Sequence, residues 1–535
     1  MNTESQTNGD LHGLSRRTFM AMAAGGMALP LTGGRVLAAS KDTLVVASGA
    51  DAVTLDPGVS FDGQSPLLWR NVYEGLVEYK EGTLELVPQL AESYEVSADQ
   101  TVYTFKIRKN VKFSDGEPLN AAAVKFNIER QINVKQGIAF ALSPVSSIET
   151  PDDFTVVLNL SAPFDAFLSA FAALYTVKMI SPKAIRDNEK DGDFAQAWLR
   201  DNMVGTGPYV MRSYKQSQQA VLERNPDYWR GWDGDHFQRV VVRYVHEAST
   251  ERLMLEQGEV DVALYLPEDV VESLDGKPGI VITNEPSYNL YYLVFNCKKG
   301  PTADVRVRQA LAYGLNYDSF IKDVLRGKAK QAHGPIPSTF VGYAADTPAY
   351  TYDPEKAKKM LADAGYPGGG FTLQYVYETG YFWKRPLGEL MQANLKDLGI
   401  EVEIQELSPS AWAGLLSNPD TADHCFGLVW WPTLATPYDY MWSLFHTAAQ
   451  GNAGYNWGYY SNPEFDKLLD AGAAEPDVQK RMALYAQAQH LLVEDSPALF
   501  IYEKNYRLAM SDKLAGFVFN GMYIETLDFY ALHSA

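Results

Sequence analysis

Two neighbouring stretches carry the strongest fold signal: PQLAESY at residues 88–94 and YTFKIRKNVKFSDG at residues 103–116. Within residues 101–108 apolar and polar side chains alternate, and one face collects Tyr103, Phe105 and Ile107. Residues 154–160 repeat this alternation, with one face formed by Phe154, Val156, Leu158 and Leu160. A period of two is typical of strands that are buried on one side. We therefore expect a β-strand in each of these segments.

Further along the chain, helical patterns are followed at once by strand patterns. Asp353 is a suitable N-cap, Pro354 fits the first helical position and Gly365 ends this helix. A second helix carries an apolar stripe of Leu387, Leu390, Met391, Leu395 and Leu398. Residues 400–405 then alternate as a half-exposed strand, and Asp477 is the N-cap of another helix. This order indicates an α/β lobe.

The composition limits the class of protein. The chain has 535 residues, 46% of them hydrophobic, which predicts about three domains with real cores. A formal net charge of −20 argues against nucleic-acid binding, because nothing would neutralise a phosphate backbone. The two cysteines, Cys297 and Cys425, are too few for a disulfide scaffold or a multi-thiolate metal site. One disulfide and two buried free thiols both remain open.

The N-terminus has the features of an export signal. Residues 15–20 read SRRTFM, residues 21–31 are short and apolar, and residues 36–40 (VLAAS) offer small side chains at cleavage spacing. The paired arginines are typical of the twin-arginine route. We predict a signal over residues 1–40 and a periplasmic mature protein, or one tethered by an uncleaved signal.

A search for catalytic motifs finds nothing that indicates an enzyme. The sequence has no G-x-S-x-G elbow and no P-loop, and His246-Glu247 lacks the second histidine of a zinc helix. His424, Cys425 and His446 are the best metal candidates, but scattered structural residues explain them better. We expect no cofactor and no metal. A secreted hydrolase is the least favoured reading.

Aromatic residues are concentrated late in the chain. One quarter of the sequence contains Trp383, Trp412, Trp430, Trp431, Trp442 and Trp457, with several tyrosines among them. Indole rings supply rigid contact area and one polar group, which suits a site for an organic ligand. Core packing is the better explanation for any single tryptophan. Glycines and prolines interleave the group, which favours loops that line a cavity.

The motifs together resemble a known family. Besides residues 88–94 and 103–116, they are VGTGPY at 204–209, NPDYW at 225–229, FN at 295–296, DVRVRQAL at 304–311 and YSNPEFDKLL at 460–469. In this order they resemble the family 5 extracellular solute-binding proteins, the peptide/nickel-type receptors of ABC importers. Most of these motifs are structural and do not identify the ligand.

The resemblance implies an α/β fold, a two-lobed clamshell (type II, cluster C) with an extra inserted domain. Domain I takes residues 41–70, 204–288 and 506–535, domain II residues 71–203 and domain III residues 289–505. Chain crossings near residues 288–296 and 502–507 form the hinge. Such a monomeric receptor closes on its ligand and docks on a permease pair with two cytoplasmic ATPases.

The family resemblance says little about the identity of the ligand. Peptide-binding members hold the ligand ammonium with an Asp three residues after a Trp, and residues 430–437 (WWPTLATP) place Thr433 there. Dipeptide-type members use an Arg where Glu378 stands, upstream of a helix that we start at Pro386, although Arg385 is close by. A hydroxyl cannot balance a buried ammonium. We therefore predict that free dipeptide termini are not the main recognition element.

Short peptides or peptide-like compounds stay the default ligand by family. Oligosaccharides or opine-like sugar conjugates are the alternative, and a nickel chelate is third. A chaperone or sensor role for the same fold remains open.

The candidate binding residues come from three places. The opposing lobe contributes Trp412, Trp430, Trp431 and Thr433, with Trp383 and Glu378. The turn after the first strand, at the carboxyl end where α/β ligands bind, contributes Asp51, Thr54 and Leu55. The hinge wall contributes Tyr291 and Tyr502. An ordinary turn and core packing are the competing explanations for the last two groups.

Overall fold

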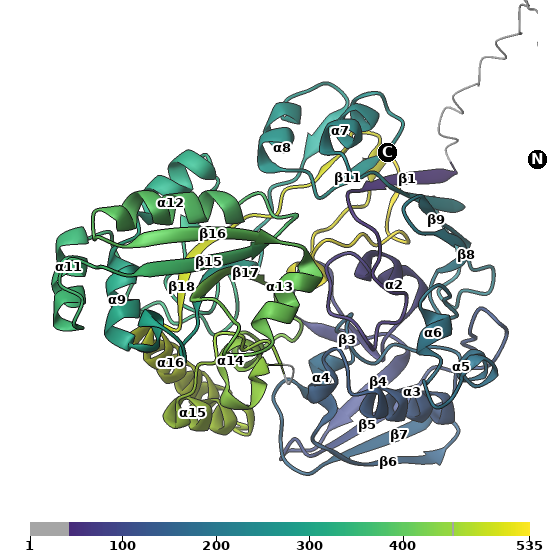
Figure 1. Cartoon of the computed structure of the whole chain (residues 1–535). Helices are drawn as coiled ribbons and strands as arrows, with labels where there is room; N and C mark the ends of the chain where they lie inside the picture. Colours follow the sequence, from purple (N-terminus) through teal and green to yellow (C-terminus); the bar gives the residue numbers. More distant parts are fainter. Residues whose placement is uncertain (1–41, 452–453) are drawn as a thin grey trace, which may run out of the picture. The chain divides into compact units, whose positions relative to one another are not determined.

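The computed structural model describes residues 42–451 and 454–535, and the predicted export signal at residues 1–40 lies outside this part of the chain. Three larger sheets organise the described residues, and Figure 1 shows two groups of elements side by side. We call the group around the seven-stranded and four-stranded sheets lobe 1, and the group around the six-stranded sheet lobe 2.

The seven-stranded sheet of lobe 1 has the order β12-β19-β11-β1-β10-β9-β8. Its central strand β1 (Thr43–Ser48) lies parallel to β10 (Arg239–Tyr244) and β11 (Val262–Leu264). β1 reads TLVVAS and is almost entirely buried, as expected for a parallel strand that is covered on both faces. The other strands are β8 (Tyr209–Lys215), β9 (Gln219–Arg224), β12 (Ile280–Ile282) and β19 (Ala509–Ser511). The adjoining helices are α7 (Ala248–Glu256) and α8 (Glu268–Leu274).

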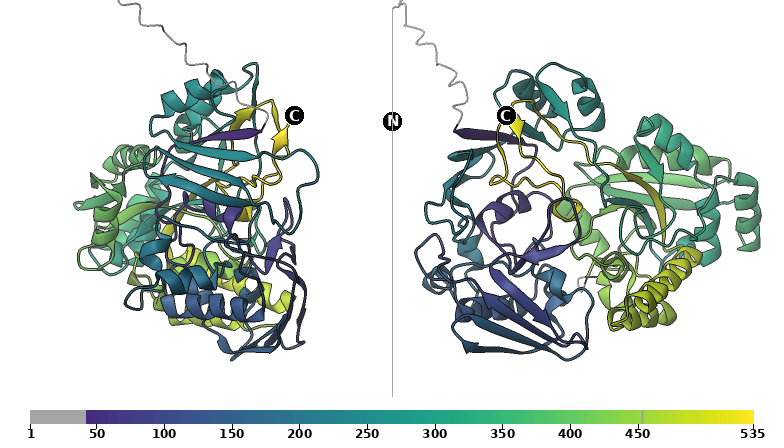
Figure 2. Two further views of the ribbon diagram at one scale, coloured as in Figure 1. Left: turned by 90° about the vertical axis from the view of Figure 1, so that its right-hand side faces the viewer. Right: turned by 180° about the vertical axis from the view of Figure 1, so that it is seen from behind.

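The four-stranded sheet of lobe 1 is antiparallel and has the order β4-β5-β7-β6 (Figure 1), and Figure 2 shows the molecule from two further sides. β5 (Val102–Ile107) and β7 (Thr155–Leu160) pair with each other, which confirms the two strands predicted from alternation. Tyr103, Phe105 and Ile107 are buried, because this face packs on the core. The outer strands are β4 (Ala91–Val96) and β6 (Val145–Asp152). The neighbouring helices are α3 (Ala121–Val134), α4 (Phe167–Ala170), α5 (Pro182–Asn188) and α6 (Gln196–Leu199).

Smaller elements complete lobe 1. They are α2 (Pro66–Val72), the hairpin of β2 (Val77–Tyr79) and β3 (Leu86–Pro88), the 3₁₀ turns η1 (Ala139–Leu142) and η6 (Gly521–Tyr523), and the pair of β20 (Leu514–Ala515) and β21 (His533–Ser534).

Lobe 2 is built on a six-stranded sheet of order β14-β18-β13-β17-β15-β16. β15 (Thr372–Glu378) lies parallel to β16 (Glu401–Leu407) and to β17 (Cys425–Trp430). The antiparallel strands are β13 (Leu290–Phe295), β14 (Ala329–Gln331) and β18 (Ala498–Lys504). Because parallel strands need a crossover, the helix between β15 and β16 was predicted correctly as the centre of a βαβ unit.

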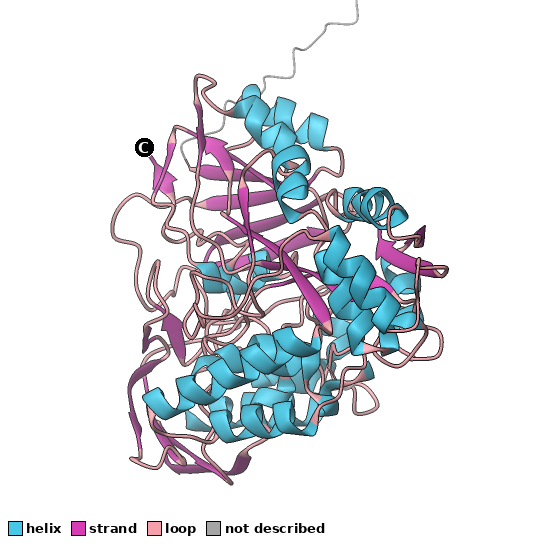
Figure 3. Cartoon of the chain, turned by 90° about the vertical axis from the view of Figure 1, so that its left-hand side faces the viewer, coloured by secondary structure: helices cyan, strands magenta, loops and turns pink. Residues whose placement is uncertain are grey.

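Helices surround this sheet, and α15 lies beside α16 (Figure 3). They are α9 (Val305–Tyr313), α10 (Tyr317–Ser319), α11 (Pro354–Asp363), α12 (Lys384–Lys396), α13 (Pro409–Leu416), α14 (Pro437–Phe445), α15 (Pro463–Ala473) and α16 (Val478–Asp495). Short turns are η2 (Pro301–Ala303), the π-helical η3 (Phe320–Val324) and η4 (Thr447–Ala449).

The predicted helix starts agree with the structure in two cases and differ in a third. The Asp353 and Asp477 carboxylates cap α11 and α16, where they accept hydrogen bonds from backbone N–H groups. α12 begins at Lys384, two residues before the start that we assigned at Pro386. Proline has no backbone N–H, and the N–H groups of the first helical turn have no partner within the helix. A proline therefore fits any position of that turn and does not mark the first residue.

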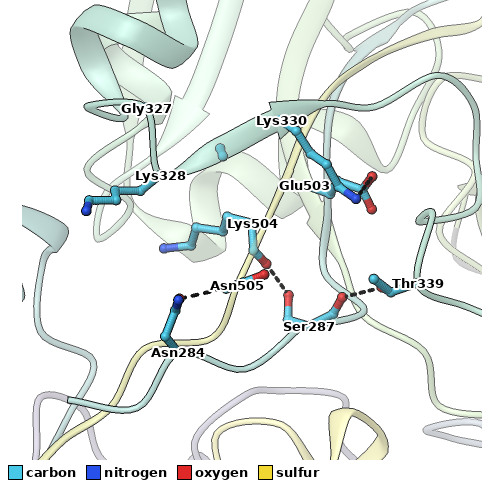
Figure 4. A pocket seen from close by; sticks show the side chains of 10 residues that line it. Asn284, Ser287, Gly327, Lys328, Lys330, Thr339, Glu503, Lys504 and Asn505 are labelled. Atoms are coloured by element: carbon cyan, nitrogen blue, oxygen red, sulfur yellow. Dashed lines mark hydrogen bonds and ion pairs between the residues drawn. The ribbon is translucent and has the colours of Figure 1, made fainter. Parts of the chain in front are cut away.

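Two antiparallel segments connect the lobes. Glu285 and Tyr506 exchange backbone hydrogen bonds of 3.0 and 2.7 Å, and the Asn505 amide donates to Asn284 over 3.1 Å (Figure 4). The Ser287 hydroxyl donates to the Lys504 carbonyl over 2.6 Å. The first crossing therefore precedes the segment that we predicted, because residues 290–295 already belong to the lobe 2 sheet as β13.

The described residues also settle the state of the cysteines. Cys297 and Cys425 are free thiols, and burial raises the pKa of Cys297 to about 11 and that of Cys425 well above its usual value, so both favour the protonated thiol at neutral pH. Among residues 42–451 and 454–535, no helix has the length and apolar character needed to cross a membrane.

Candidate ligand-binding site

One edge of the lobe 2 sheet brings predicted site residues together. Glu378 is the last residue of β15 and Trp430 the last residue of β17, and these strands are parallel. The carboxyl ends of parallel strands are where α/β proteins usually bind ligands. In lobe 1 the parallel strand β11 ends directly before Tyr265, whose hydroxyl donates to the Gly63 carbonyl over 2.8 Å.

The Phe61 ring of lobe 1 lies among rings of lobe 2. Its centroid is 5.1 Å from that of Trp430, 5.3 Å from that of Tyr455, and 5.3 Å from that of Trp431, on which it stacks. Tyr175 of lobe 1 lies 4.7 Å from Phe61, and its hydroxyl accepts a 3.2 Å hydrogen bond from the Trp431 indole. We call Phe61, Tyr175, Trp430, Trp431 and Tyr455 the inter-lobe cluster.

The inter-lobe cluster continues into lobe 2 through further rings. Tyr455 lies 5.6 Å from Trp457, and Trp457 meets Trp412 edge to face at 5.2 Å. Trp412 is therefore linked to Trp430 through ring contacts. Trp412 is buried, and its indole nitrogen has no hydrogen-bond partner among the described residues.

A buried ion pair lies beside these rings. The Lys384 ammonium binds the Glu378 carboxylate, and both side chains are almost completely buried. The Lys384 nitrogen lies 4.3 Å from the ring centroid of Tyr381 and 5.1 Å from that of Trp412. Burial lowers the pKa of Lys384 to about 8, and the Glu378 charge opposes that shift. Glu378 thus carries no free charge, and Arg385 is turned to Glu389 at 3.0 Å.

The predicted hinge-wall tyrosines form a stack behind this pair. Tyr291 and Tyr502 stack with centroids 4.0 Å apart, and Trp383 meets Tyr291 edge to face at 5.3 Å. All three side chains are buried. The Trp383 indole nitrogen, the Tyr502 hydroxyl and Glu378 Oε2 have no hydrogen-bond partner among the described residues.

Thr433 is committed to an internal contact. Its hydroxyl donates to Asp439 Oδ1 over 2.7 Å and its backbone N–H to Oδ2 over 2.8 Å. Asp439 is fully buried, and burial raises its pKa to about 6 against these hydrogen bonds. The Trp430 indole also holds this pKa down, although its N–H makes no hydrogen bond of ordinary geometry with any described residue. A carboxylate thus lies behind Thr433, where it orients the loop.

The candidates after the first strand lie outside the inter-lobe cluster, although Thr54 is linked to it indirectly: its carbonyl accepts a 3.1 Å hydrogen bond from the Trp69 indole, whose ring meets Tyr175 edge to face at 5.9 Å. Asp51 accepts hydrogen bonds from the Ser217 backbone and hydroxyl at 2.7 and 3.0 Å. The Thr54 hydroxyl accepts from the Asp56 backbone, and Leu55 is fully buried in the core. The next part of the same loop meets lobe 2 at Phe61.

A buried ion pair fixes this loop. Arg130 on α3 binds both oxygens of Asp56, at 3.1 and 2.5 Å, and both side chains are buried. This bidentate geometry is the strongest form of such a pair.

Glu525 of lobe 1 is a residue that the sequence did not single out. Its carboxylate lies against Gly63, so close that a Cβ atom at Gly63 would stand 2.7 Å from Oε2. Burial raises the pKa of Glu525 to about 7, and the charge of Lys504 opposes the shift. Glu525 is an isolated acid in an irregular loop, so no spacing or periodicity could have found it. Phe61 and Tyr175 escaped notice for the same reason.

Polar contacts also join the lobes away from the inter-lobe cluster. The buried Asp165 side chain accepts hydrogen bonds from Thr436 over 2.6 Å and from Tyr485 over 3.0 Å. Arg326 of lobe 2 pairs with Glu272 of lobe 1 at 2.8 Å. The open pocket of about 320 Å³ at the connecting segments has lysine and asparagine walls and contains none of the candidate residues (Figure 4).

The best metal candidates do not form a centre. His424 accepts a hydrogen bond from the Gln374 backbone over 3.2 Å, and His446 lies 3.4 Å from Asp470. Among the residues that the structure describes, no three histidine, cysteine or acidic side chains are arranged to hold a metal ion.

Two α/β lobes, two connecting segments and an aromatic cluster between the lobes define a two-lobed solute-binding protein. The family model "Bacterial extracellular solute-binding proteins, family 5 Middle" matches residues 85–452. The chain therefore belongs to the bacterial extracellular solute-binding proteins of family 5. This confirms the resemblance, the fold and the function of a solute-binding protein of an ABC importer.

Known relatives align with this chain over nearly its full length. The chain is 34% identical over 489 residues to the probable D,D-dipeptide-binding periplasmic protein DdpA of Escherichia coli K12, covering 91% of this chain and 93% of that one. It is 30% identical to the glutathione-binding protein GsiB of Pectobacterium atrosepticum, covering 90% and 92%. The structure of the periplasmic binding protein DppA of Helicobacter pylori with the peptide STSA matches with a TM-score of 0.82 at 27% identity, covering 92% and 98%.

Proposed function

We propose that this protein is a periplasmic receptor that captures a short peptide or a peptide-like compound between its lobes and delivers it to a membrane permease. The observation that carries the proposal is the inter-lobe cluster, in which Phe61 of lobe 1 contacts Trp430, Trp431 and Tyr455 of lobe 2. Contacts that form only when the lobes meet favour closure, and a ligand that touches both lobes adds to them. Relatives named for dipeptides and glutathione support the ligand class.

The ligand-contacting residues that we propose are the members of the inter-lobe cluster together with Trp412, Trp383 and Glu378. Rigid rings with indole donors suit the edges and amide groups of peptides. Lys384 holds Glu378 in place, and Thr433 shapes the loop through Asp439. No reaction step is required, because capture and release leave the ligand unchanged.

The domain division that we propose follows the sheets. The seven-stranded sheet draws its strands from residues 43–48, 209–282 and 509–511, which supports a discontinuous domain I. The four-stranded sheet lies within residues 91–160 and supports an inserted domain II, and the six-stranded sheet within residues 290–504 supports domain III. We also propose that the protein acts as a monomer.

A second candidate ligand class is the opine-like sugar conjugates and oligosaccharides. The observation that favours it concerns Thr433, which stands where peptide-binding members place an Asp that binds the ligand ammonium. The Thr433 hydroxyl already donates its hydrogen bond to Asp439. Aromatic faces also stack on sugar rings.

A thermal-shift panel tests the proposal, because a ligand that binds only the folded protein raises the melting temperature by mass action. The panel contains L-Ala-L-Ala, D-Ala-D-Ala, glutathione, maltotriose and mannopinic acid, and isothermal titration follows on each hit. Binding of a peptide supports the main proposal, and binding of the sugar compounds alone supports the second. No shift with any member contradicts both.

Export is tested separately. We propose that residues 15–20 direct the chain to the periplasm by the twin-arginine route. Replacing Arg16 and Arg17 by Lys keeps the charge but removes the paired arginines. We expect the variant to remain in the cytoplasmic fraction while the native chain appears in the periplasmic fraction, and equal export of both contradicts the route.

A further inference from the structure

Glu525 is a half-buried carboxylate at the interface between the lobes that has no partner of its own. No hydrogen bond or ion pair joins it to any residue in the described ranges 42–451 and 454–535. The ammonium of Lys504 lies within its electrostatic reach, but Lys504 lies 3.7 Å from Glu268, which also binds Arg507. Lys504 therefore shares Glu268 with Arg507 and acts on Glu525 only through its charge, without an ion pair or hydrogen bond.

The surroundings of Glu525 come from both lobes. The pKa values of Tyr265 and Tyr506 in lobe 1 and of Tyr291 in lobe 2 are raised. Burial is the main cause of these shifts, and the negative charge of Glu525 is the second. Burial, then the charges of Glu378 and Glu525, raise the pKa of Tyr381 in lobe 2. The negative charge of Glu525 thus acts across the interface, toward the edge of the lobe 2 sheet.

The backbone holds the carboxylate in this position at a cost. Glu525 has a φ of +59° and Tyr265 a φ of +66°, a left-handed conformation that side-chain-bearing residues rarely adopt. Such strain persists where the surrounding structure imposes it, and it is concentrated at functional sites. Gly63 completes the arrangement, because any side chain there would occupy the space of the carboxylate.

A carboxylate without a partner in an aromatic environment suits a cationic group. An ammonium that binds at this half-buried carboxylate gains a charge pair in a partly desolvated site, where Coulombic attraction is stronger than in bulk water.

We infer that Glu525 receives the ammonium group of the ligand and so selects for primary amines. It supplies from lobe 1 the charge that Thr433 cannot supply from lobe 2. This inference rests on the proposed function and names the ligand class within it: an organic ligand with a free amine, such as a peptide with an unblocked N-terminus. Our expectation that free dipeptide termini are not the main recognition element considered lobe 2 alone.

The test compares matched pairs of ligands. Isothermal titration measures L-Ala-L-Ala, D-Ala-D-Ala and glutathione, each against its N-acetyl derivative, with the native protein and with Glu525→Gln. The glutamine keeps the shape and removes the charge. The matched control is Glu259→Gln, an exposed acid of lobe 1, which changes the net charge equally.

We expect the native protein to bind at least one free amine 30-fold or more tightly than its N-acetyl form, and Glu525→Gln to reduce that ratio below about 3. The control keeps the native ratio. Gly63→Ala, which displaces the carboxylate without removing it, reduces the ratio as well. The melting temperature of Glu525→Gln stays at or above the native value, because an unpaired charge is lost.

Two results overturn the inference and leave the proposed function intact: equal native affinity for both members of each pair, or an unchanged ratio in Glu525→Gln. If the native protein binds none of the six compounds, the proposed peptide function fails, and this inference fails with it.

Discussion

Truncation of Phe61 tests whether the inter-lobe cluster drives closure. Phe61→Ala removes three ring contacts with lobe 2, at centroid distances of 5.1 to 5.3 Å from Trp430, Trp431 and Tyr455. An aromatic pair contributes about 0.5–1.5 kcal/mol beyond its buried area, so three pairs contribute about 1.5–4.5 kcal/mol. Each 1.4 kcal/mol is a factor of ten, so ligand affinity falls roughly 10- to 1,000-fold.

The stability of the folded chain changes less than the affinity. Phe61 is half-buried, and within lobe 1 its ring contact is with Tyr175. The matched control is Phe126→Ala, because Phe126 is a half-buried ring on α3 whose face meets the Arg186 guanidinium 5.3 Å away in the same lobe. We expect the control to lower the melting temperature and to leave affinity unchanged.

The assay is isothermal titration with the compound that gives the largest thermal shift, together with small-angle scattering of the bound protein. A larger radius of gyration for ligand-bound Phe61→Ala than for the native protein indicates incomplete closure. Native affinity in Phe61→Ala, with a drop in melting temperature similar to that of Phe126→Ala, refutes the reasoning, because the rings then act only as packing.

Three further predictions concern binding and stability. Trp430→Ala weakens ligand binding by roughly 2–4 kcal/mol in titration, and unchanged affinity with lower thermal stability assigns the ring to the core. Asp56→Ala leaves Arg130 buried without its partner, so the free energy of unfolding measured in urea falls by about 3–5 kcal/mol; a loss below 1 kcal/mol contradicts a dry, bidentate pair. Burial raises the pKa of Glu251 to about 8, so the folded state keeps a proton that the unfolded state releases near pH 4.5, and the free energy of unfolding falls by on the order of 5 kcal/mol as pH rises through this window. Glu251→Gln removes that part of the slope in melting temperatures measured from pH 5 to 9, and identical slopes contradict the assignment.

The sequence determined the local structure of this protein. Strand alternation identified β5 and β7, and the caps at Asp353 and Asp477 identified helix starts, because both signals depend on neighbours within one or two turns. The motif order also determined the family. The start of α12 was misplaced because Pro386 fits any position of a first turn.

The tertiary structure alone decided which candidates meet. Trp412, Trp430 and Trp431 were predictable as a group from their density, but their connection to Phe61 joins residues far apart in the chain. The pairing of Glu378 with Lys384 and of Thr433 with Asp439 changes what each residue offers a ligand: the charge of Glu378 is neutralised, and the hydroxyl proton of Thr433 is already donated. No sequence pattern marks Glu525. Its proposed role depends on its position at the interface between the lobes and on the lack of a hydrogen bond or ion pair to any described residue, and only the folded structure shows these features.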